Sequence, residues 1–385
     1  MLKGKDIPFA RPFIGQAEKR AVLKVLDGPV LVHGPMAVAF EKAFMNYTGA
    51  PYAVAVSSCT AALHLTYFHL GICPGDEVIV PAQTHVATAH AVELCGAKPV
   101  FVDAEKSTGN MDLDLLERSL GPRTKAISIV HFLGMPINMV RVMQIAKKRG
   151  LFVVEDCALA VGSFFNNTHA GLHGDVGCFS FYPVKHITTA EGGMLITRHA
   201  SLAAKIARQK AFGVDRSVSQ RSVPGVYDVT MLGLNYLMNE LQAALGIEQL
   251  KRVPEILRRR KENYNQLSRG LATIEELRQF KSSHGNYQSS YYCLSVMLDE
   301  TLAEKRPEII NYFRRRGIGT SVYYPRPVPH FSYYTNKYRY SESSYPAASW
   351  ISQNSIALPV GPHLNPRDMK SIVKCFKDAI SEAVK

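Results

Sequence analysis

The chain lacks the features that would place it in a membrane or outside the cell. No apolar run reaches the length of about 18 residues that a membrane-spanning helix requires. The first residues, MLKGKDIPFARPFIGQAEK, contain no apolar core of a signal peptide. Internal repeats and low-complexity tracts are missing too, and the mean hydropathy of −0.05 is typical of globular proteins. We therefore expect a soluble, cytoplasmic protein without a membrane partner.

Paired cysteine motifs are also missing. The seven cysteines are an odd number, and none of them forms a CxxC pair. Cys59, Cys95, Cys157 and Cys178 stand among apolar residues, which favours reduced thiols in a core over a disulfide framework or a zinc site. The sequence therefore predicts no metal centre.

Acidic residues are in deficit. The chain has 45 Lys and Arg but only 32 Asp and Glu, so its formal net charge is +13. This excess favours anionic partners such as phosphate esters, nucleotides or nucleic acid. The basic residues gather in short clusters at 147–149, 258–261 and 314–316, each within a helix-like polar stretch. Solvent-exposed helix faces explain these clusters more simply than a nucleic-acid surface, so we expect no nucleic-acid partner.

The length of 385 residues fits two domains or one large one. Between residues 50 and 200, short β-branched runs alternate with amphipathic helical segments. Strands are expected at 52–56, 77–81, 98–103, 125–132, 151–155, 177–181 and 193–197, and helices at 60–70, 86–95, 112–120 and 139–149. This alternation predicts an α/β fold with a mainly parallel sheet between helices, whose ligands lie beyond the carboxyl ends of the strands.

The C-terminal part differs in composition. Charge clusters and much of the tyrosine and proline lie beyond residue 250. One long helix is expected over residues 235–260 and a last amphipathic helix over residues 366–384. We therefore expect a large domain of residues 1–250 and a smaller α+β domain of residues 251–385.

The first candidate motif is VSSCTAALHL, residues 56–65. A predicted strand ends in small hydroxyl residues and runs directly into a helix. The N–H groups of the first helical turn and the positive end of the helix dipole form an anion site, to which Thr60 can add a hydroxyl. An ordinary Ser or Thr helix cap is the alternative interpretation.

The second motif is VVEDCA, residues 153–158, in which an acidic pair ends a buried apolar strand. A carboxylate without water around it needs a cationic partner, and a protonated ring nitrogen would serve. The alternative is that Asp156 caps a helix.

The third motif is GDVGCFSFYPVKHITTAEGGM, residues 174–194. A strand delivers Ser180 and the following turn delivers Lys185, whose neighbours indicate a partly buried amine that can form a Schiff base. Alone, this lysine would be taken for a surface residue of a loop. Together, the three motifs supply what a pyridoxal phosphate (PLP) site needs: an amine for the aldehyde, a carboxylate for the ring nitrogen, and a helix start with a serine for the phosphate.

With these motifs, the sequence resembles the sugar aminotransferases of the DegT/DnrJ/EryC1/StrS family, PLP enzymes with the aspartate aminotransferase fold, also called fold type I. The stretch FSFYPVKHITTAEGG is the most specific part of the resemblance. The similarity is greatest to members that aminate C4 of nucleotide-linked 4-keto-6-deoxy sugars. The resemblance extends over residues 28–40, 75–89, 153–162, 179–197, 233–250 and 358–362.

The resemblance implies how the cofactor is held. Lys185 would form the Schiff base and move a proton between the cofactor carbon and the sugar carbon. Asp156 would pair with the pyridinium nitrogen, where an ionised carboxylate deepens the electron sink. The backbone around Cys59, together with Thr60 and Ser180, would hold the phosphate.

Two further positions follow from the resemblance. His85 would stack on the cofactor ring, and the alternative is a buried histidine at a helix start. Asn235 would reach the phosphate of the neighbouring subunit, which implies a homodimer with shared active sites. A helix N-cap by Asn235 is compatible with that role.

The implied reaction has two halves. L-glutamate, the usual donor in the family, leaves its amine on the cofactor, and a keto sugar takes it up, for a surface polysaccharide or a glycosylated metabolite. Tyr323 and His330 are the candidate substrate residues. Leu159, Tyr323 and Ser349 replace residues that are common in the family, so a non-standard keto sugar, such as an eight-carbon sugar acid, is an alternative substrate.

Three other functions compete with this interpretation. PLP-dependent sugar 3-dehydratases carry His in place of the Schiff-base Lys, whereas here Lys185 is present and His186 follows it. An amino-acid aminotransferase is compatible with the fold. A non-enzymatic, basic binding protein on a PLP fold is the third, although no helix-turn-helix or zinc pattern lies outside the α/β part.

Overall fold

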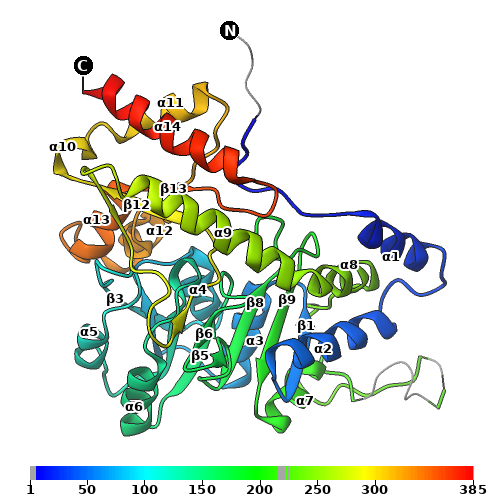
Figure 1. The fold of residues 1–385 in the computed structure, drawn as a ribbon. Coiled ribbons are helices and arrows are strands. Elements are labelled where there is room, and N and C mark those ends of the chain that lie inside the picture. Colours follow the sequence, from blue (N-terminus) through cyan, green and yellow to red (C-terminus); the bar gives the residue numbers. More distant parts are fainter. Residues whose placement is uncertain (1–5, 216–221, 224, 385) are drawn as a thin grey trace.

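The computed structural model describes residues 6–215, 222–223 and 225–384. Figure 1 shows a large sheet covered by helices, with a smaller sheet and further helices above it. The helices are α1 (Gln16–Leu26), α2 (Pro35–Thr48), α3 (Cys59–His69), α4 (Val86–Glu93), α5 (Leu113–Arg118), α6 (Met139–Arg149), α7 (Ala200–Gln209), α8 (Glu240–Lys251), α9 (Val253–Leu271), α10 (Glu300–Ala303), α11 (Arg306–Arg315), α12 (Ser332–Tyr338), α13 (Pro346–Asn354) and α14 (Pro366–Ala383), with 3₁₀ turns η1 (Phe132–Gly134) and η3 (Val328–His330).

The large sheet has the strand order β1-β9-β8-β5-β4-β2-β3. The pairs β8–β5, β5–β4, β4–β2 and β2–β3 are parallel, whereas β9 runs antiparallel to both β1 and β8. The predicted α/β fold with a mainly parallel sheet is therefore confirmed. Its strands are β1 (Tyr52–Val56), β2 (Glu77–Pro81), β3 (Lys98–Val102), β4 (Thr124–Val130), β5 (Phe152–Asp156), β8 (Val176–Ser180) and β9 (Gly193–Thr197).

Side chains alternate between the two faces of this sheet, as the pleat requires. Val78 and Val80 pack into the core cluster that contains residues of α3 and α4, whereas Ile79 packs into the cluster that contains residues of α6. Both faces are therefore buried, which explains why the strands are continuously apolar rather than alternating.

Two smaller sheets complete the chain. The first is antiparallel with the order β10-β12-β13, and it packs with α9, α11 and α14 around a core cluster of its own. Whether a domain boundary falls after residue 250 stays a prediction, since side chains of the last third of the chain also join the core of the large sheet. The remaining strands are β6 (Phe164–Phe165), β7 (Thr168–His169), β10 (Leu277–Gln279), β11 (Tyr287–Gln288), β12 (Leu294–Leu298) and β13 (Ser355–Leu358).

The single helix predicted over residues 235–260 is wrong. Asn239 caps α8 through a capping box with Gln242, so the helix starts at Glu240, five residues later than predicted. The break near residue 252 has a local cause. Pro254 lacks a backbone N–H and fits only a first helical turn, so α8 ends and α9 begins around it.

The basic clusters mostly lie on exposed helix faces, as expected. Arg258 pairs with Glu262, Arg315 pairs with Glu382, and Lys148 pairs with Glu117. Arg260 is different, because it is only 5% exposed and donates to the carbonyl of Tyr292 at 2.7 Å. Among the described residues, no helix combines the length and the apolar character that crossing a membrane would require.

Candidate active site

Asp156 ends β5 at the carboxyl edge of the large sheet and is 5% exposed. Its Oδ2 accepts a hydrogen bond from the Thr88 hydroxyl at 2.8 Å, and its Oδ1 accepts one from the Ala158 N–H at 3.1 Å. The Cys59 thiol lies 3.8 Å from Oδ1. The residues directly after Asp156 form a turn rather than a helix, so the interpretation of Asp156 as a helix N-cap is wrong. All of these partners can donate hydrogen bonds to the carboxylate oxygens.

Glu155 points to the other face of the sheet, as the alternation along a strand demands. It is fully buried and accepts hydrogen bonds from His131 Nε2 at 2.9 Å and from the N–H groups of Gly171 and His173 at 2.7 and 2.8 Å. Burial acts to raise the pKa of Glu155, but the hydrogen bond and the charge of His131 outweigh it, so the pKa is lowered. Glu155 therefore connects His131 and residues 171–173 to β5 behind the site. The sulfur of Cys157 lies near the same pair.

Lys185 lies in the turn that follows β8, where its backbone N–H donates to the Tyr182 carbonyl at 2.9 Å. Its Nζ is 5.6 Å from the centre of the Tyr292 ring. Burial lowers the pKa of the amine, whereas the nearby Cys59 and Asp156 act to raise it. The Lys185 amine thus has little water around it and lies close to the carboxylate of Asp156. Its lowered pKa makes the electron pair of the amine more readily available to an electrophile.

The start of α3 lies against the same edge. Ser58 caps the helix, and its hydroxyl accepts a hydrogen bond from the Ala61 N–H at 3.0 Å. The cap that the sequence left as an alternative is therefore present, but it belongs to Ser58 and uses only one of the donors at the helix start. Within the described part of the chain, the N–H groups of Cys59 and Thr60 have no partner. They remain free to bind an anion at the positive end of the helix.

The ends of three strands bring Ser180 to this helix start. Ser180, the last residue of β8, is 8% exposed and pairs with Gly193 of β9, which in turn pairs with Val56 of β1. A Cβ atom on Gly193 would lie 2.4 Å from the carbonyl carbon of Ser58, so only glycine allows β9 to approach α3 this closely. Amine, carboxylate, hydroxyl and helix start thus converge on one edge, and their chemistry fits PLP.

Comparison with known proteins agrees with this chemistry. The sequence model of the DegT/DnrJ/EryC1/StrS aminotransferase family matches residues 12–377. The chain belongs to this family. It is also 37% identical over 383 residues to the spore coat polysaccharide biosynthesis protein SpsC of Bacillus subtilis, with 98% of both chains covered.

Solved structures of the DegT/DnrJ/EryC1/StrS family share the whole fold. Spr1654 of Streptococcus pneumoniae, assigned as a sugar aminotransferase and solved in its PLP form, superposes with a TM-score of 0.93 at 29% identity, over 99% of this chain and all of that one. PseC of Helicobacter pylori, an aminotransferase of pseudoaminic acid biosynthesis, superposes with a TM-score of 0.91 at 26% identity, over 98% of this chain and all of that one. The protein is a PLP-dependent sugar aminotransferase.

The surroundings of His85 and Asn235 differ from the simpler alternatives, which were a buried histidine at a helix start and a helix N-cap. His85 caps α4 and accepts from the Ala87 N–H at 3.2 Å, but its side chain is exposed rather than buried. Burial of its surroundings and the charge of Lys185 lower its pKa, so the ring is neutral near pH 7. Asn235 is exposed in an extended segment that pairs with Ala211, and the N-cap of the next helix is Asn239 instead.

The two predicted substrate residues have different surroundings. The Tyr323 hydroxyl is 2.8 Å from that of Tyr292, whose ring faces the Lys185 amine, so Tyr323 lies one residue away from the site. His330 contacts the ring of Tyr345 at 6.0 Å, and its Nε2 is buried without a partner among the described residues. The structure thus gives positional support to Tyr323 and none to His330.

Two further departures from the family pattern lie in buried surroundings. Leu159 is 3% exposed and joins the core beneath α3 and α4. The Ser349 hydroxyl in α13 is buried and has no partner in the described residues. Two residues of the site were not singled out by the sequence. Thr88 contacts Asp156, and the ring of Tyr292 faces Lys185. The only sequence signal for Thr88 was its place four residues after Thr84, in the segment that follows β2.

Proposed function

We propose that the protein transfers the amine of L-glutamate to C4 of a nucleotide-linked 4-keto-6-deoxyhexose in the cytoplasm. The observation that carries the proposal is the placement of the partly buried Lys185 amine close to the Asp156 carboxylate, with the tyrosine ring of Tyr292 beside it. The paired hydroxyls of Tyr292 and Tyr323 offer polar groups next to this amine, which suits a sugar better than an apolar substrate. The positive net charge of +13 suits two anionic substrates.

The pathways of two relatives support the pathway part of the proposal. SpsC is named for spore coat polysaccharide biosynthesis and PseC for pseudoaminic acid biosynthesis. We therefore propose that the product enters a surface polysaccharide or another glycoconjugate.

PLP supplies an aldehyde that can carry an amine and a ring that takes up the electron pair of a broken C–H bond. The N–H groups of Cys59 and Thr60, with the Ser180 hydroxyl, would bind its phosphate. Asp156 would keep a proton on the ring nitrogen, because its carboxylate accepts but cannot donate. Burial lowers the pKa of Lys185, so Nζ can take a proton from one carbon and return it to another.

The cover of the site would come from aromatic side chains. His85 lies 6.0 Å from the ring of Tyr324, and Tyr292 is 3% exposed. Burial raises the pKa of Tyr324 well above its ordinary value, and the charge of Asp156 adds to this effect, so its hydroxyl stays protonated during turnover. These rings would exclude water from the reacting carbon and orient the sugar.

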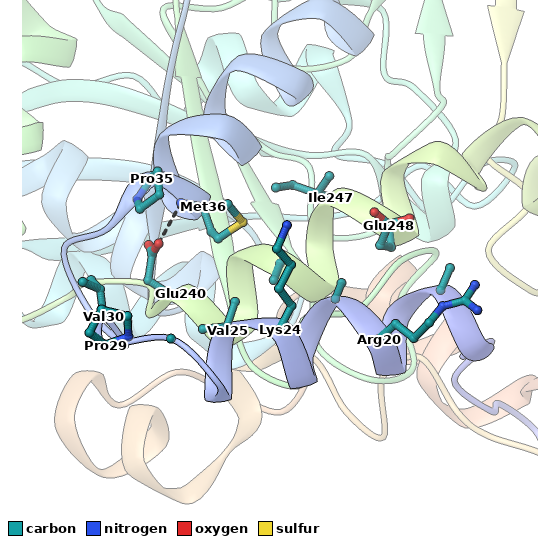
Figure 2. A pocket seen from close by; sticks show the side chains of 14 residues that line it. Arg20, Lys24, Val25, Pro29, Val30, Pro35, Met36, Glu240, Ile247 and Glu248 are labelled. Carbon is teal, nitrogen blue, oxygen red and sulfur yellow. Dashed lines mark hydrogen bonds between the residues drawn. The ribbon is translucent and has the colours of Figure 1, made fainter.

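A homodimer with shared sites is part of the proposal. A groove of about 640 Å³ lies between α1, α2 and α8 (Figure 2), and Glu240 at its rim accepts hydrogen bonds from the N–H groups of Met36 and Ala37 at 2.7 and 3.1 Å. Asn235, which would reach the partner's phosphate, lies five residues before Glu240, on the segment that leads into α8. We propose that a second copy of the chain covers this face. The exposed large apolar side chains there are Ile14, Leu23, Leu26, Val30, Leu31, Val32 and Val38.

The reaction is tested by visible absorption of the PLP-loaded protein. L-glutamate should convert the bound cofactor to its pyridoxamine form, and the correct keto sugar should restore the original band. The panel of acceptors contains nucleotide-linked 4-keto-6-deoxyhexoses, an eight-carbon keto sugar acid and simple 2-oxo acids. A faster return with a 2-oxo acid than with every sugar would refute the sugar specificity, and Lys185→Ala serves as the inactive control.

Shared sites are tested by mixing two inactive variants. Asn235→Ala and Lys185→Ala would each weaken every site of their own homodimer. A mixed dimer would contain one site with both native residues, so mixing should restore part of the L-glutamate half-reaction. An activity no higher than the average of the separate variants would refute the shared site.

A further inference from the structure

Two threonine hydroxyls lie behind Asp156 and form a short hydrogen-bonded chain. Thr84 and Thr88 are 1% and 0% exposed, and their Oγ1 atoms are 2.8 Å apart. Thr88 Oγ1 is in turn 2.8 Å from Asp156 Oδ2. Thr84 immediately precedes His85, and Thr88 lies in the first turn of α4, so the start of this one helix supports both Asp156 and the neighbouring histidine.

The direction of the chain follows from counting hydrogens. An ionised carboxylate only accepts, so Thr88 must donate to Asp156. The Thr88 hydroxyl has a single hydrogen, and this hydrogen is committed to Asp156. The hydrogen between the two threonines must therefore come from Thr84. Both hydroxyls then point towards the carboxylate, and each bond polarises the next.

The turn after β5 gives Asp156 little other support. Leu159, three residues later, is apolar and buried, and the turn contributes only the Ala158 N–H to Oδ1. The Cys59 thiol, at 3.8 Å from Oδ1, is a weak donor, and burial raises its pKa well above its ordinary value. The Thr88 hydroxyl is therefore the strongest side-chain contact that holds the second carboxylate oxygen.

We infer that Thr88, backed by Thr84, is a positioning residue that holds Asp156 ionised and oriented towards the ring nitrogen of PLP. This inference rests on the proposed role of Asp156. With one oxygen held by Ala158 and the other by Thr88, the carboxylate is restrained from rotating, and its remaining lone pairs would be available to the cofactor. Without the Thr88 hydroxyl, one buried oxygen loses its donor and the carboxylate turns more freely.

The chain offers variants that separate the hydroxyl from the shape of the side chain. Thr88→Val keeps the branched shape but removes the donor, whereas Thr88→Ser keeps the donor. Thr84→Val removes only the second hydroxyl. Thr66→Val is a matched control, because Thr66 is also fully buried but donates to the Ala62 carbonyl at 2.8 Å. Asp156→Asn is the reference for loss of the carboxylate charge.

Three quantities are measured for each variant: the affinity of the apoprotein for PLP, the pH profile of the visible band, and the rate of the half-reaction with L-glutamate. Hydrogen bonds to charged groups suggest that Thr88→Val weakens PLP binding and slows the half-reaction by about 10- to 100-fold. Its pH profile should move in the direction of that of Asp156→Asn. Thr88→Ser and Thr66→Val should behave like the native protein, and Thr84→Val should lie between.

The outcomes distinguish this inference from the proposed function. A native pH profile and native affinity in Thr88→Val, with a changed profile in Asp156→Asn, would overturn the inference and leave the role of Asp156 intact. A native profile in Asp156→Asn would overturn both. Equal losses in Thr88→Val and Thr88→Ser, or in Thr66→Val, would show that packing rather than the hydroxyl is responsible, and this too would overturn the inference.

Discussion

Gly193 offers a sharp test of how the phosphate end of the site is built. In the row Val56–Gly193–Ser180, a Cβ atom on the glycine would lie 2.4 and 2.5 Å from the carbonyl carbon and oxygen of Ser58, and 2.6 Å from the nitrogen of Cys59. All three contacts are backbone atoms, so no side chain can swing away. Ordinary contacts begin at 3.4 Å, so Gly193→Ala would have to increase the separation between β9 and the start of α3 by about 1 Å.

This displacement should lower both the stability of the fold and the affinity for PLP. Overpacking of a filled core typically lowers the free energy of unfolding by about 1–3 kcal/mol. For a cooperative unit of about 250 residues this corresponds to a fall in Tm of about 2–6 °C. Because the displaced N–H groups are those proposed to bind the phosphate, PLP affinity should fall by about tenfold as well, the worth of one charge-assisted hydrogen bond.

The assay is thermal unfolding of the apoprotein and PLP titration, in parallel on Gly193→Ala and Gly121→Ala. Gly121 is a matched control because a Cβ there would meet only the flexible Glu77 side chain, at 3.4 Å. Gly121→Ala should change neither quantity. Native Tm and native affinity in Gly193→Ala would refute the argument that glycine is required here. A lowered Tm with native affinity would show that the helix start does not bind the phosphate.

Three further predictions concern charges at the site. Asp156→Asn should slow both half-reactions by about 100-fold, measured by single-turnover absorption, and native rates would mean that another group protonates the ring. Lys185→Met should raise the Tm of the apoprotein at pH 7. Burial lowers the pKa of Lys185 in the folded protein, so the native lysine destabilises the fold, and this penalty is complete below the folded pKa. The penalty disappears as the pH rises towards the ordinary pKa of lysine. The gain in Tm of Lys185→Met should therefore vanish at that high pH. Glu155→Gln should lower the free energy of unfolding in urea by about 3–5 kcal/mol at pH 7. Because the pKa of Glu155 is lowered, this contribution is present above its unfolded pKa and disappears as the pH falls through the folded value, so the two proteins should converge in acid.

Much of the large sheet could be predicted because each element carries a local signal. The strands Tyr52–Val56, Glu77–Pro81 and Gly193–Thr197 and the helix Met139–Arg149 have the predicted ends, and the other predicted elements between residues 50 and 200 agree within two residues. The last helix, predicted to Val384, ends at Ala383.

The errors also have local causes. The apolar periodicity of 235–260 hid two competing signals, the capping box that begins at Asn239 and Pro254 in the first turn of the next helix. The burial of Arg260 could not be read from a charge cluster, because its hydrogen-bond partner Tyr292 lies 32 residues away.

The candidate site was predictable only where one residue carries a distinctive chemistry. Lys185 and Asp156 stand in motifs whose neighbours indicate burial. Thr88 does not, because its role depends on a contact between side chains 68 residues apart, made where the first turn of α4 meets the end of β5. A threonine in a helix predicts no such contact, since most bond their own backbone or water.

The single antiparallel strand β9 has a consequence for how such an enzyme can diversify. Val56, Gly193 and Ser180 occupy one row across β1, β9 and β8, and neighbouring strands in a sheet are about 4.8 Å apart. The distance between the start of α3 and Ser180 is therefore set by the spacing of the paired strands, which cannot change gradually. Tyr323 lies outside the helices and strands, and its ring neighbours Phe9 and Tyr292 come from other segments of the chain. The part of the site proposed to hold the cofactor is thus set by the register of the sheet, whereas segments outside the sheet, such as that of Tyr323, are less constrained and can vary more easily.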